Sequence, residues 1–163
     1  MDYLIPVVGT MALLGSALVG GIFFAFSSFI MKALAAVSPP AGIGAMQSIN
    51  VVVINPSFLG AFFGTAVLSL VAGGLALAGW PSPFAAFFLG GALCYLAGTI
   101  LVTILGNVPL NDRLAAVSAT DPAARGVWKH YLGRWTMWNH VRTAAAMVAA
   151  LLYTLGLMEI GGA

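Results

Sequence analysis

The stretch PSFLGAFFGTAVLSLVAGGLALAG, residues 56–79, decides the fold class of this chain. It carries no charged side chain from its first residue to its last. A helix needs roughly 20 apolar residues to cross about 30 Å of hydrocarbon, so this stretch can span a bilayer. Lipid offers no hydrogen-bond partner to a free backbone amide, and a helix satisfies its amides within one segment. We therefore predict a transmembrane helix here.

Three further stretches are equally apolar and long enough to cross a membrane: 4–31, 84–106 and 139–158. The whole chain is 61% hydrophobic and 6% charged, whereas soluble domains carry about 25% charged residues. These features predict an all-α protein, an integral membrane four-helix bundle that forms a single membrane domain over residues 1–163.

The two long links between the spans have helical features of their own. Residues 41–54 are too short to span and are polar at Gln47 and Asn50, so we predict an interfacial or re-entrant segment before the second span. Asn55-Pro56 is typical of an N-cap followed by the first helical residue. Pro39-Pro40 should end the first helix, and the segment 107–112 should end the third.

A helical pattern from Pro122 predicts an amphipathic extension that leads into the fourth span. The six basic residues all lie in or beside the two long links: Lys32, Arg113, Arg125, Lys129, Arg134 and Arg142. Short loops rich in Lys and Arg remain on the cytoplasmic side. We therefore predict a multi-pass protein of the inner (plasma) membrane, with both long links in the cytoplasm and both termini outside.

The expected partners follow from the same composition. The lipid bilayer is the first of them, and a net charge of +2 gives no indication of nucleic acid binding. Small residues recur along the first span and would allow close helix packing, within the bundle or between copies in a homo-oligomer: Gly9, Ala12, Gly15, Ser16, Gly20 and Gly21. Cys94 is the only cysteine, so no intrachain disulfide can form.

The most informative stretch is WKHYLGRWTMWNHVR, residues 128–142. At about 100° per residue, one helical stripe collects Trp128, Tyr131, Trp135, Trp138, Asn139 and Arg142. An aromatic belt at the membrane interface would explain the rings, above all Trp128 and Tyr131. It explains Asn139 and Arg142 poorly.

Arg142 lies about one turn inside the apolar fourth span, where a charge usually faces a partner or a polar cavity. The alternative is that the Arg142 side chain extends outward to the membrane interface (snorkelling) and has no partner in the bundle. Asp112 is the acid nearest to a span end on the same side, so we predict an Arg142–Asp112 pair. The pair would lie within a cluster of asparagines: Asn50, Asn55, Asn107, Asn111 and Asn139.

Two histidines suggest a metal or haem site, but weakly. His130 and His140 lie ten residues apart on one helix and cannot meet at one metal ion. No metal is therefore expected, and His140 as an axial haem ligand is a minor alternative to an interfacial histidine.

Several motifs together resemble one family. They are AFSSFIMKAL (25–34), MQSIN (46–50), NPSF (55–58), NVPLNDRL (107–114) and WTMWNHVRT (135–143). They resemble the anthrone-oxygenase-like family of small four-span membrane proteins, most of whose bacterial members have no assigned function. The family often has Pro-Gly where this chain has Lys32-Ala33, so the first helix could end differently.

The resemblance implies oxidation of an anthrone to an anthraquinone by dioxygen, without metal or flavin. In that scheme Asp112 is the candidate base, and Arg142, Asn139 and Asn107 are donors to an oxyanion. Asn111 completes the catalytic set. The substrate-binding candidates are Trp135, Trp138, Gln47, Asn50 and Tyr131. The substrate would be a planar phenolic or quinol-like lipophile, bound at the cytoplasmic end of the bundle without a cofactor.

Two other classes of function remain as alternatives. A non-catalytic four-span partner, assembly subunit or lipid-binding subunit would use the same polar cluster for binding alone. A small transporter ranks last, because such carriers generally need an ionisable residue at mid-membrane and none of the spans has one there.

Overall fold

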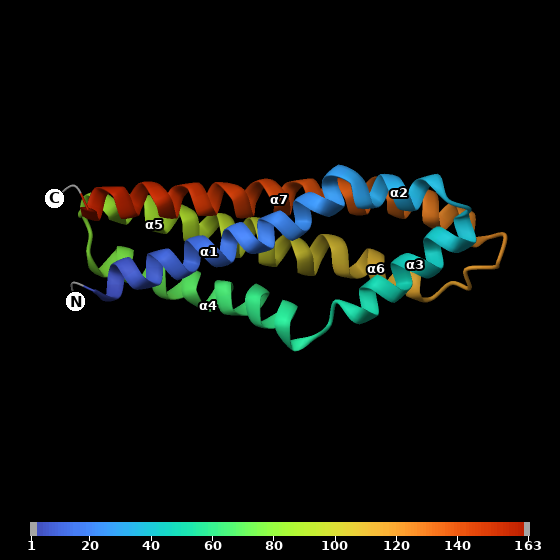
Figure 1. The fold of residues 1–163 in the computed structure, drawn as a ribbon, viewed down its shortest axis with the longest axis horizontal. Coiled ribbons are helices and arrows are strands. Elements are labelled where there is room, and N and C mark those ends of the chain that lie inside the picture. Colours follow the sequence, from blue (N-terminus) through green and yellow to red (C-terminus); the bar gives the residue numbers. More distant parts are fainter. Residues whose placement is uncertain (1–2, 162–163) are drawn as a thin grey trace.

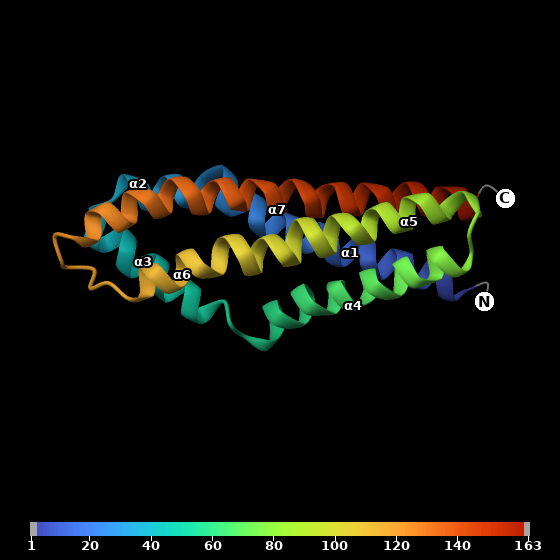
Figure 2. The same ribbon diagram turned by 180° about the vertical axis from the view of Figure 1, so that it is seen from behind.

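The computed structural model describes residues 3–161, and this part of the chain forms four long helices that lie side by side (Figures 1 and 2). All four are long and apolar enough to cross a membrane. They run over Leu4–Ala36, Pro56–Ala78, Pro83–Ala115 and Ala124–Gly161. The chain is therefore an all-α membrane bundle, as predicted.

Two of these helices change geometry along their length. The first consists of α1 (Leu4–Ala25), the π-helix η1 (Phe26–Ile30) and α2 (Met31–Ala36). The third consists of α5 (Pro83–Leu93), the π-helices η2 (Cys94–Leu101) and η3 (Thr103–Asn107), and α6 (Val108–Ala115). Single π-turns inside α-helices are frequent at functional sites. The remaining helices are α3 (Pro39–Val52), α4 (Pro56–Ala78) and α7 (Ala124–Gly161).

The two ends of the bundle differ in chemistry. Both described ends of the chain lie together at one end, and α2, α3 and the start of α7 lie at the other (Figure 1). This second end, here called the basic end, contains Lys32, Arg113, Arg125, Lys129 and Arg134. The fold thus brings these basic residues, which are spread along the sequence, to the same end of the bundle. The predicted cytoplasmic location of this end and the type of membrane stay predictions.

The predicted helix boundaries around α3 are confirmed. The first helix ends at Ala36, before Pro39, and the family departure at Lys32-Ala33 does not interrupt it. The side-chain oxygen of Asn55 accepts a hydrogen bond of 3.0 Å from the backbone N–H of Phe58, and Pro56 is the first helical residue. The segment predicted to be interfacial or re-entrant forms the helix α3, which lies beside α6 at the basic end (Figures 1 and 2).

The predicted end of the third helix at 107–112 is wrong. The helix continues through Pro109 to Ala115. A proline lacks a backbone N–H and its ring presses on the carbonyl one turn earlier. Here that turn belongs to η3, and such local π-helical geometry lets a membrane helix accommodate a proline. As a consequence Asn111 and Asp112 project from a helix and not from a turn.

The small residues of the first span pack within the chain. A Cβ atom on Gly9 would collide with the ring of Phe88, and one on Gly15 would collide with Thr65. This face of α1 is therefore covered by α4 and α5, while Gly21 meets no neighbouring atom within 4 Å. A homo-oligomer of this chain stays a prediction.

The fourth helix is much longer than a bilayer requires. Its 38 residues extend over about 57 Å at 1.5 Å per residue, against about 30 Å of hydrocarbon. Arg125, Lys129 and Arg134 lie on its first half, and Arg142 lies at its midpoint. A helix of this length extends beyond the hydrocarbon, and its charged residues other than Arg142 and Glu159 lie on the half at the basic end.

Candidate functional site

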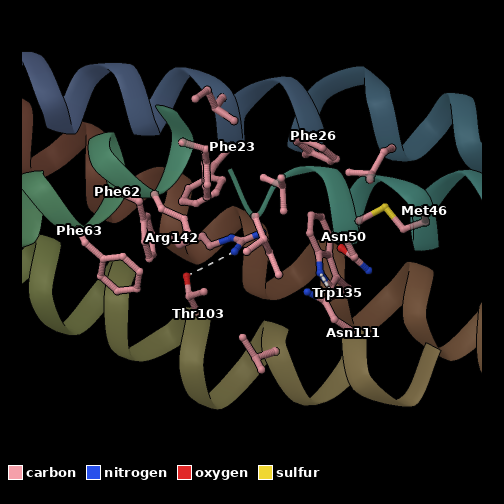
Figure 3. A pocket seen from close by; sticks show the side chains of 17 residues that line it. Phe23, Phe26, Met46, Asn50, Phe62, Phe63, Thr103, Asn111, Trp135 and Arg142 are labelled. Atoms are coloured by element: carbon pink, nitrogen blue, oxygen red, sulfur yellow. Dashed lines mark hydrogen bonds between the residues drawn. The ribbon is translucent and has the colours of Figure 1, made fainter. Parts of the chain in front are cut away.

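A cavity of about 230 Å³ opens in the half of the bundle near the basic end. It lies among α1, η1, α3, α4, η3, α6 and α7 (Figure 3). A cavity of about 150 Å³ lined by apolar side chains holds benzene, so this space can accept a ring system larger than one ring. Most of its wall is apolar, and its larger side chains include Phe23, Phe26, Met46, Phe58, Phe62 and Trp135.

The mouth of the cavity faces an apolar surface. Ile54, Phe63 and Val108 line the cavity and are 70%, 52% and 41% exposed. They come from the start of α4, the link before it and the start of α6. Phe63 and Val108 lie on helices that are long and apolar enough to span a membrane, so the mouth opens at an apolar surface of the bundle.

Arg142 carries the one charge on the cavity wall, counted over the described residues. Its side chain is only 6% exposed. The guanidinium carbon lies 4.0 Å from the ring centroid of Phe23 and 4.9 Å from that of Trp135. Nη1 donates to the Thr103 hydroxyl at 3.4 Å, while Nη2 makes no hydrogen bond within residues 3–161. Free N–H groups of a cation thus face an apolar cavity.

Asn139 fixes the position of this guanidinium. Its side-chain oxygen accepts a hydrogen bond of 3.0 Å from Nε of Arg142. Its Nδ2 donates at 2.7 Å both to the backbone carbonyl of Phe23 and to the hydroxyl of Ser27. Asn139 is fully buried, so each of these bonds forms away from water. The predicted association of Asn139 with Arg142 therefore appears as one hydrogen-bonded unit that ties α7 to the first helix.

The predicted Arg142–Asp112 pair does not form, and within residues 3–161 no carboxylate lies within 4.0 Å of the guanidinium. Asp112 is exposed and lies outside the cavity. Because α6 continues through this region, Asp112 points about 100° away from Asn111, which borders the cavity. Asp112 instead lines an adjoining groove that shares Asn50 and Asn111 with the cavity wall.

A second polar group borders the cavity on the side away from Arg142 (Figure 3). The side-chain oxygen of Asn111 accepts two hydrogen bonds of 2.8 Å, from the Tyr131 hydroxyl and from Nε1 of Trp135. Nδ2 of Asn50 donates to the Tyr131 hydroxyl at 3.5 Å. Asn50 and Asn111 both reach the cavity, whereas Tyr131 lies behind them and positions them.

The aromatic stripe of α7 divides into two parts. Trp128, Tyr131 and Trp135 are buried and stacked, with centroid separations of 5.7 and 5.8 Å. Of these three rings, Trp135 borders the cavity. Trp138 does not, because its indole packs over Gly106, where a Cβ atom would lie 2.8 Å from the ring. Trp138, a predicted substrate-binding residue, therefore does not line this cavity.

Two predicted site residues support the architecture instead. Nδ2 of Asn107 donates to the backbone carbonyl of Trp135 at 3.1 Å, and Asn107 does not border the cavity. Nε2 of Gln47 donates to the carbonyls of Leu114 and Val117 at 2.8 and 2.9 Å, which ties α3 to the end of α6. The amides of both residues therefore hold helices together around the site.

The phenylalanines of the cavity were not predicted as site residues. Phe23, Phe58 and Phe62 form its apolar wall, with Phe58 and Phe62 stacked at 5.7 Å. In the sequence they look like ordinary residues of a span. The sequence offers one indication, since Phe23 lies four residues before Ser27 and Phe58 lies three residues after Asn55.

Neither histidine contributes to the cavity. His130 and His140 are exposed on α7 and absent from its wall. The part of the chain that the structure describes contains no group of three His, Cys, Asp or Glu side chains able to hold a metal ion. Haem ligation by His140 stays an untested alternative, and a haem bound there would lie outside the cavity.

These features define a helical membrane protein with an apolar cavity bordered by a buried arginine that has no carboxylate partner within residues 3–161. The sequence matches the family model described as anthrone oxygenase over residues 57–152, more than half of the chain, so the chain belongs to the anthrone oxygenase family. The matched region includes most of the cavity-lining helices α4, η3, α6 and α7. No curated protein and no solved structure matches the chain.

The role of Asn139 can be tested by removing its amide. We expect Asn139→Leu to lower the free energy of unfolding by about 2 kcal/mol or more, because Nε of Arg142 loses its buried acceptor. The matched control is His140→Leu, the exposed neighbour on the same helix. Thermal melting of the two variants in the same detergent measures the difference, and equal melting temperatures would contradict the role.

Proposed function

We propose that this protein is a cofactor-independent oxygenase of a planar phenolic or quinol-like lipophile. The observation that supports this proposal most strongly is the Arg142 guanidinium, which borders an apolar cavity without a carboxylate partner among the described residues. Membership of the anthrone oxygenase family supports the same class of reaction.

A buried charge without a counter-charge is costly, and the cost falls when an anion binds beside it. The cavity is apolar otherwise, so Coulomb attraction between Arg142 and an oxyanion would act in a low effective dielectric. Donors that are already in place when charge develops stabilise an oxyanion without reorganisation. Arg142, fixed by Asn139 and with Nη2 free, has these properties.

The proposed chemistry begins with proton loss. An anthrone-like substrate loses a C–H proton to a base, and the electron pair becomes delocalised onto the carbonyl oxygen, which binds Arg142. The electron-rich anion passes one electron to O₂, and the resulting radical and superoxide combine to form a C–O bond. Protonation gives a hydroperoxide, and loss of water leaves a carbonyl. One O₂ is consumed, one oxygen atom enters the product and the other leaves in water.

The proton acceptor in this proposal is Asp112. It lies in the groove that adjoins the cavity beyond Asn50 and Asn111. Because Asp112 is exposed, it would take the proton through this polar passage and not by direct contact with a molecule deep in the cavity. The exposed position also allows the proton to pass on to water.

The apolar wall accounts for the flat shape of the proposed substrate. Phe58 and Phe62 stack on each other, and Phe23 meets each of them edge to face at 6.4 and 6.2 Å. Trp135 closes another side of the cavity. Such aromatic surfaces favour a planar ring system, and the lipid-facing mouth would admit a molecule that is soluble in the bilayer.

Removal of the cation tests the proposal. We expect Arg142→Gln to decrease oxygen uptake with dithranol, an anthrone, by roughly a hundredfold, because loss of one oxyanion donor typically has this effect. The measurement is O₂ consumption together with anthraquinone absorbance, corrected for autoxidation in protein-free nanodiscs. Arg134→Gln is the matched control, since Arg134 is an exposed arginine on the same helix.

Equal rates in the Arg142→Gln and Arg134→Gln variants would contradict the proposed function. A wild-type protein that binds dithranol and leaves its autoxidation rate unchanged would contradict it too. That second result would instead indicate the non-catalytic alternative, a lipid-binding or assembly subunit that uses the same cavity.

The role of Asp112 has its own test. We expect Asp112→Asn to lower the rate of oxygen uptake roughly tenfold or more at neutral pH, since general bases contribute at least that much. Raising the pH should restore part of the rate, because hydroxide can replace the lost carboxylate. Glu159→Gln, an exposed carboxylate at the opposite end of the bundle, is the control. An unchanged rate in Asp112→Asn would remove this residue from the mechanism.

A further inference from the structure

We propose that the cavity also binds a lipophilic carboxylate, with both carboxylate oxygens on the Nη1–Nη2 edge of Arg142 and the apolar body of the ligand against the cavity wall. Such a ligand would occupy the place of the proposed substrate and inhibit its oxidation. The inhibition rests on the proposed function, whereas the binding itself requires no oxygen chemistry. The same cavity would thus have a second class of ligand and a means of regulation.

The guanidinium of Arg142 has one edge left for a ligand. Its Nε donates to the side-chain oxygen of Asn139 at 3.0 Å. Nη1 and Nη2 each carry two N–H groups, and within residues 3–161 the only acceptor for them is the Thr103 hydroxyl, 3.4 Å from Nη1. The rings of Phe23 and Trp135, whose centroids lie 4.0 and 4.9 Å from the guanidinium carbon, offer no oxygen to these groups. The remaining N–H groups are therefore available beside the cavity.

A carboxylate matches this edge better than a single oxygen does. Its two oxygens accept two parallel N–H···O bonds from a guanidinium, and such bidentate pairs are stronger than hydrogen bonds between neutral groups. A phenolate presents one oxygen to the same edge. Because Nε is bound to Asn139, the Nη1–Nη2 edge of Arg142 is the one on which both bonds can form. The geometry therefore favours a ligand that ends in a carboxylate.

The charge of the ligand at neutral pH favours the same choice. A carboxyl group has an ordinary pKa of about 4, whereas a phenol such as the tyrosine side chain has one of about 10. At pH 7 a carboxylate reaches Arg142 already ionised, while only roughly one phenol molecule in a thousand does. An anion that is already formed can neutralise the buried cation without a proton transfer.

The wall beyond Arg142 requires the rest of the ligand to be apolar. Phe58 and Phe62 stack at 5.7 Å, and Phe23 meets both edge to face (Figure 3). The cavity of about 230 Å³ exceeds the roughly 150 Å³ that holds benzene. A lipid phosphate fits less well, because a phosphodiester carries a polar substituent on each side of its anion and these rings offer no partner to it. A carboxylate ends its chain, so all of its polar atoms can lie at Arg142.

The test compares two ligands of nearly the same shape that differ in charge. The dissociation constants of 2-naphthoic acid and of its neutral analogue 2-naphthamide are measured by titration calorimetry at pH 7 on the whole protein in zwitterionic nanodiscs. Protein-free nanodiscs correct for partition into lipid. We expect wild-type protein to bind the carboxylate roughly tenfold more tightly than the amide, because hydrogen bonds between charged groups contribute more than neutral ones. Equal affinities, or tighter binding of the amide, would overturn the inference.

Two substitutions distinguish bidentate contact from a simple positive charge. Arg142→Lys retains the charge on a single nitrogen and should lose most of the preference for the carboxylate, and Arg142→Gln should lose all of it. Binding of 2-naphthamide to each variant reports that the cavity is intact. Arg134→Gln, at an exposed position on the same helix, is the control and should behave as wild type. A preference that survives Arg142→Gln would contradict the proposed site.

The source of the carboxylate is identified by a third ligand, dodecanoic acid. Tighter binding of 2-naphthoic acid than of dodecanoic acid indicates a planar aromatic acid, as we expect from the aromatic wall. The reverse order indicates a fatty acid of the membrane, and either order supports a carboxylate site. If neither acid binds the wild-type protein, the inference fails.

Inhibition separates this inference from the proposed function. 2-Naphthoic acid should raise the KM for dithranol in oxygen uptake and leave kcat unchanged, because the two molecules compete for Arg142. If 2-naphthoic acid binds but does not inhibit oxidation, its site lies outside the substrate cavity and the inference is wrong. If the wild-type protein binds 2-naphthoic acid through Arg142 but does not oxidise dithranol, the proposed function fails and the carboxylate site stands.

Discussion

The hydrogen bond between Asn139 and Arg142 is the interaction on which the site depends. A guanidinium in a mostly apolar bundle needs acceptors, and here a neutral amide supplies one where a carboxylate would have neutralised the charge. The same amide holds the first helix through Phe23 and Ser27. The position of the cation is thus fixed by packing between α7 and α1, while its charge remains available to a ligand. A carboxylate in the place of Asn139 would neutralise the charge of Arg142, and this charge would then no longer attract a bound anion.

The rest of the bundle maintains a space beside this cation. The π-helical segment before Pro109 allows the third helix to continue, so that α6 brings Asn111 to the cavity and carries Asp112 past it. Gln47 ties α3 to the end of α6, and Asn107 ties the third helix to α7. Small residues let α1 approach α4 and α5 closely at the other end. Close packing at one end and amide bridges at the other leave room for a ligand between them.

Much of the fold follows from the sequence because four apolar segments in lipid can only be helices. The Trp135–Asn139–Arg142 stripe was predictable for a similar reason, since helical periodicity fixes which side chains share a face. The partner of Arg142 was not predictable. It depends on how α6 is rotated after Pro109, and the sequence suggested a turn at that point. The position of Trp138 was not predictable either, because its indole packs over Gly106 in η3 and does not line the cavity.

The central claim is that Arg142 stabilises an oxyanion inside the cavity. The most direct test is the pH at which protein-bound 1-naphthol ionises, followed by its ultraviolet absorbance in nanodiscs. An apolar cavity alone raises the pKa of a phenol, whereas a buried cation lowers it. We expect bound 1-naphthol to ionise at a lower pH than free 1-naphthol in wild-type protein, and at a higher pH in Arg142→Gln. Ionisation of the bound ligand at or above the pH of the free ligand in wild-type protein would contradict the account.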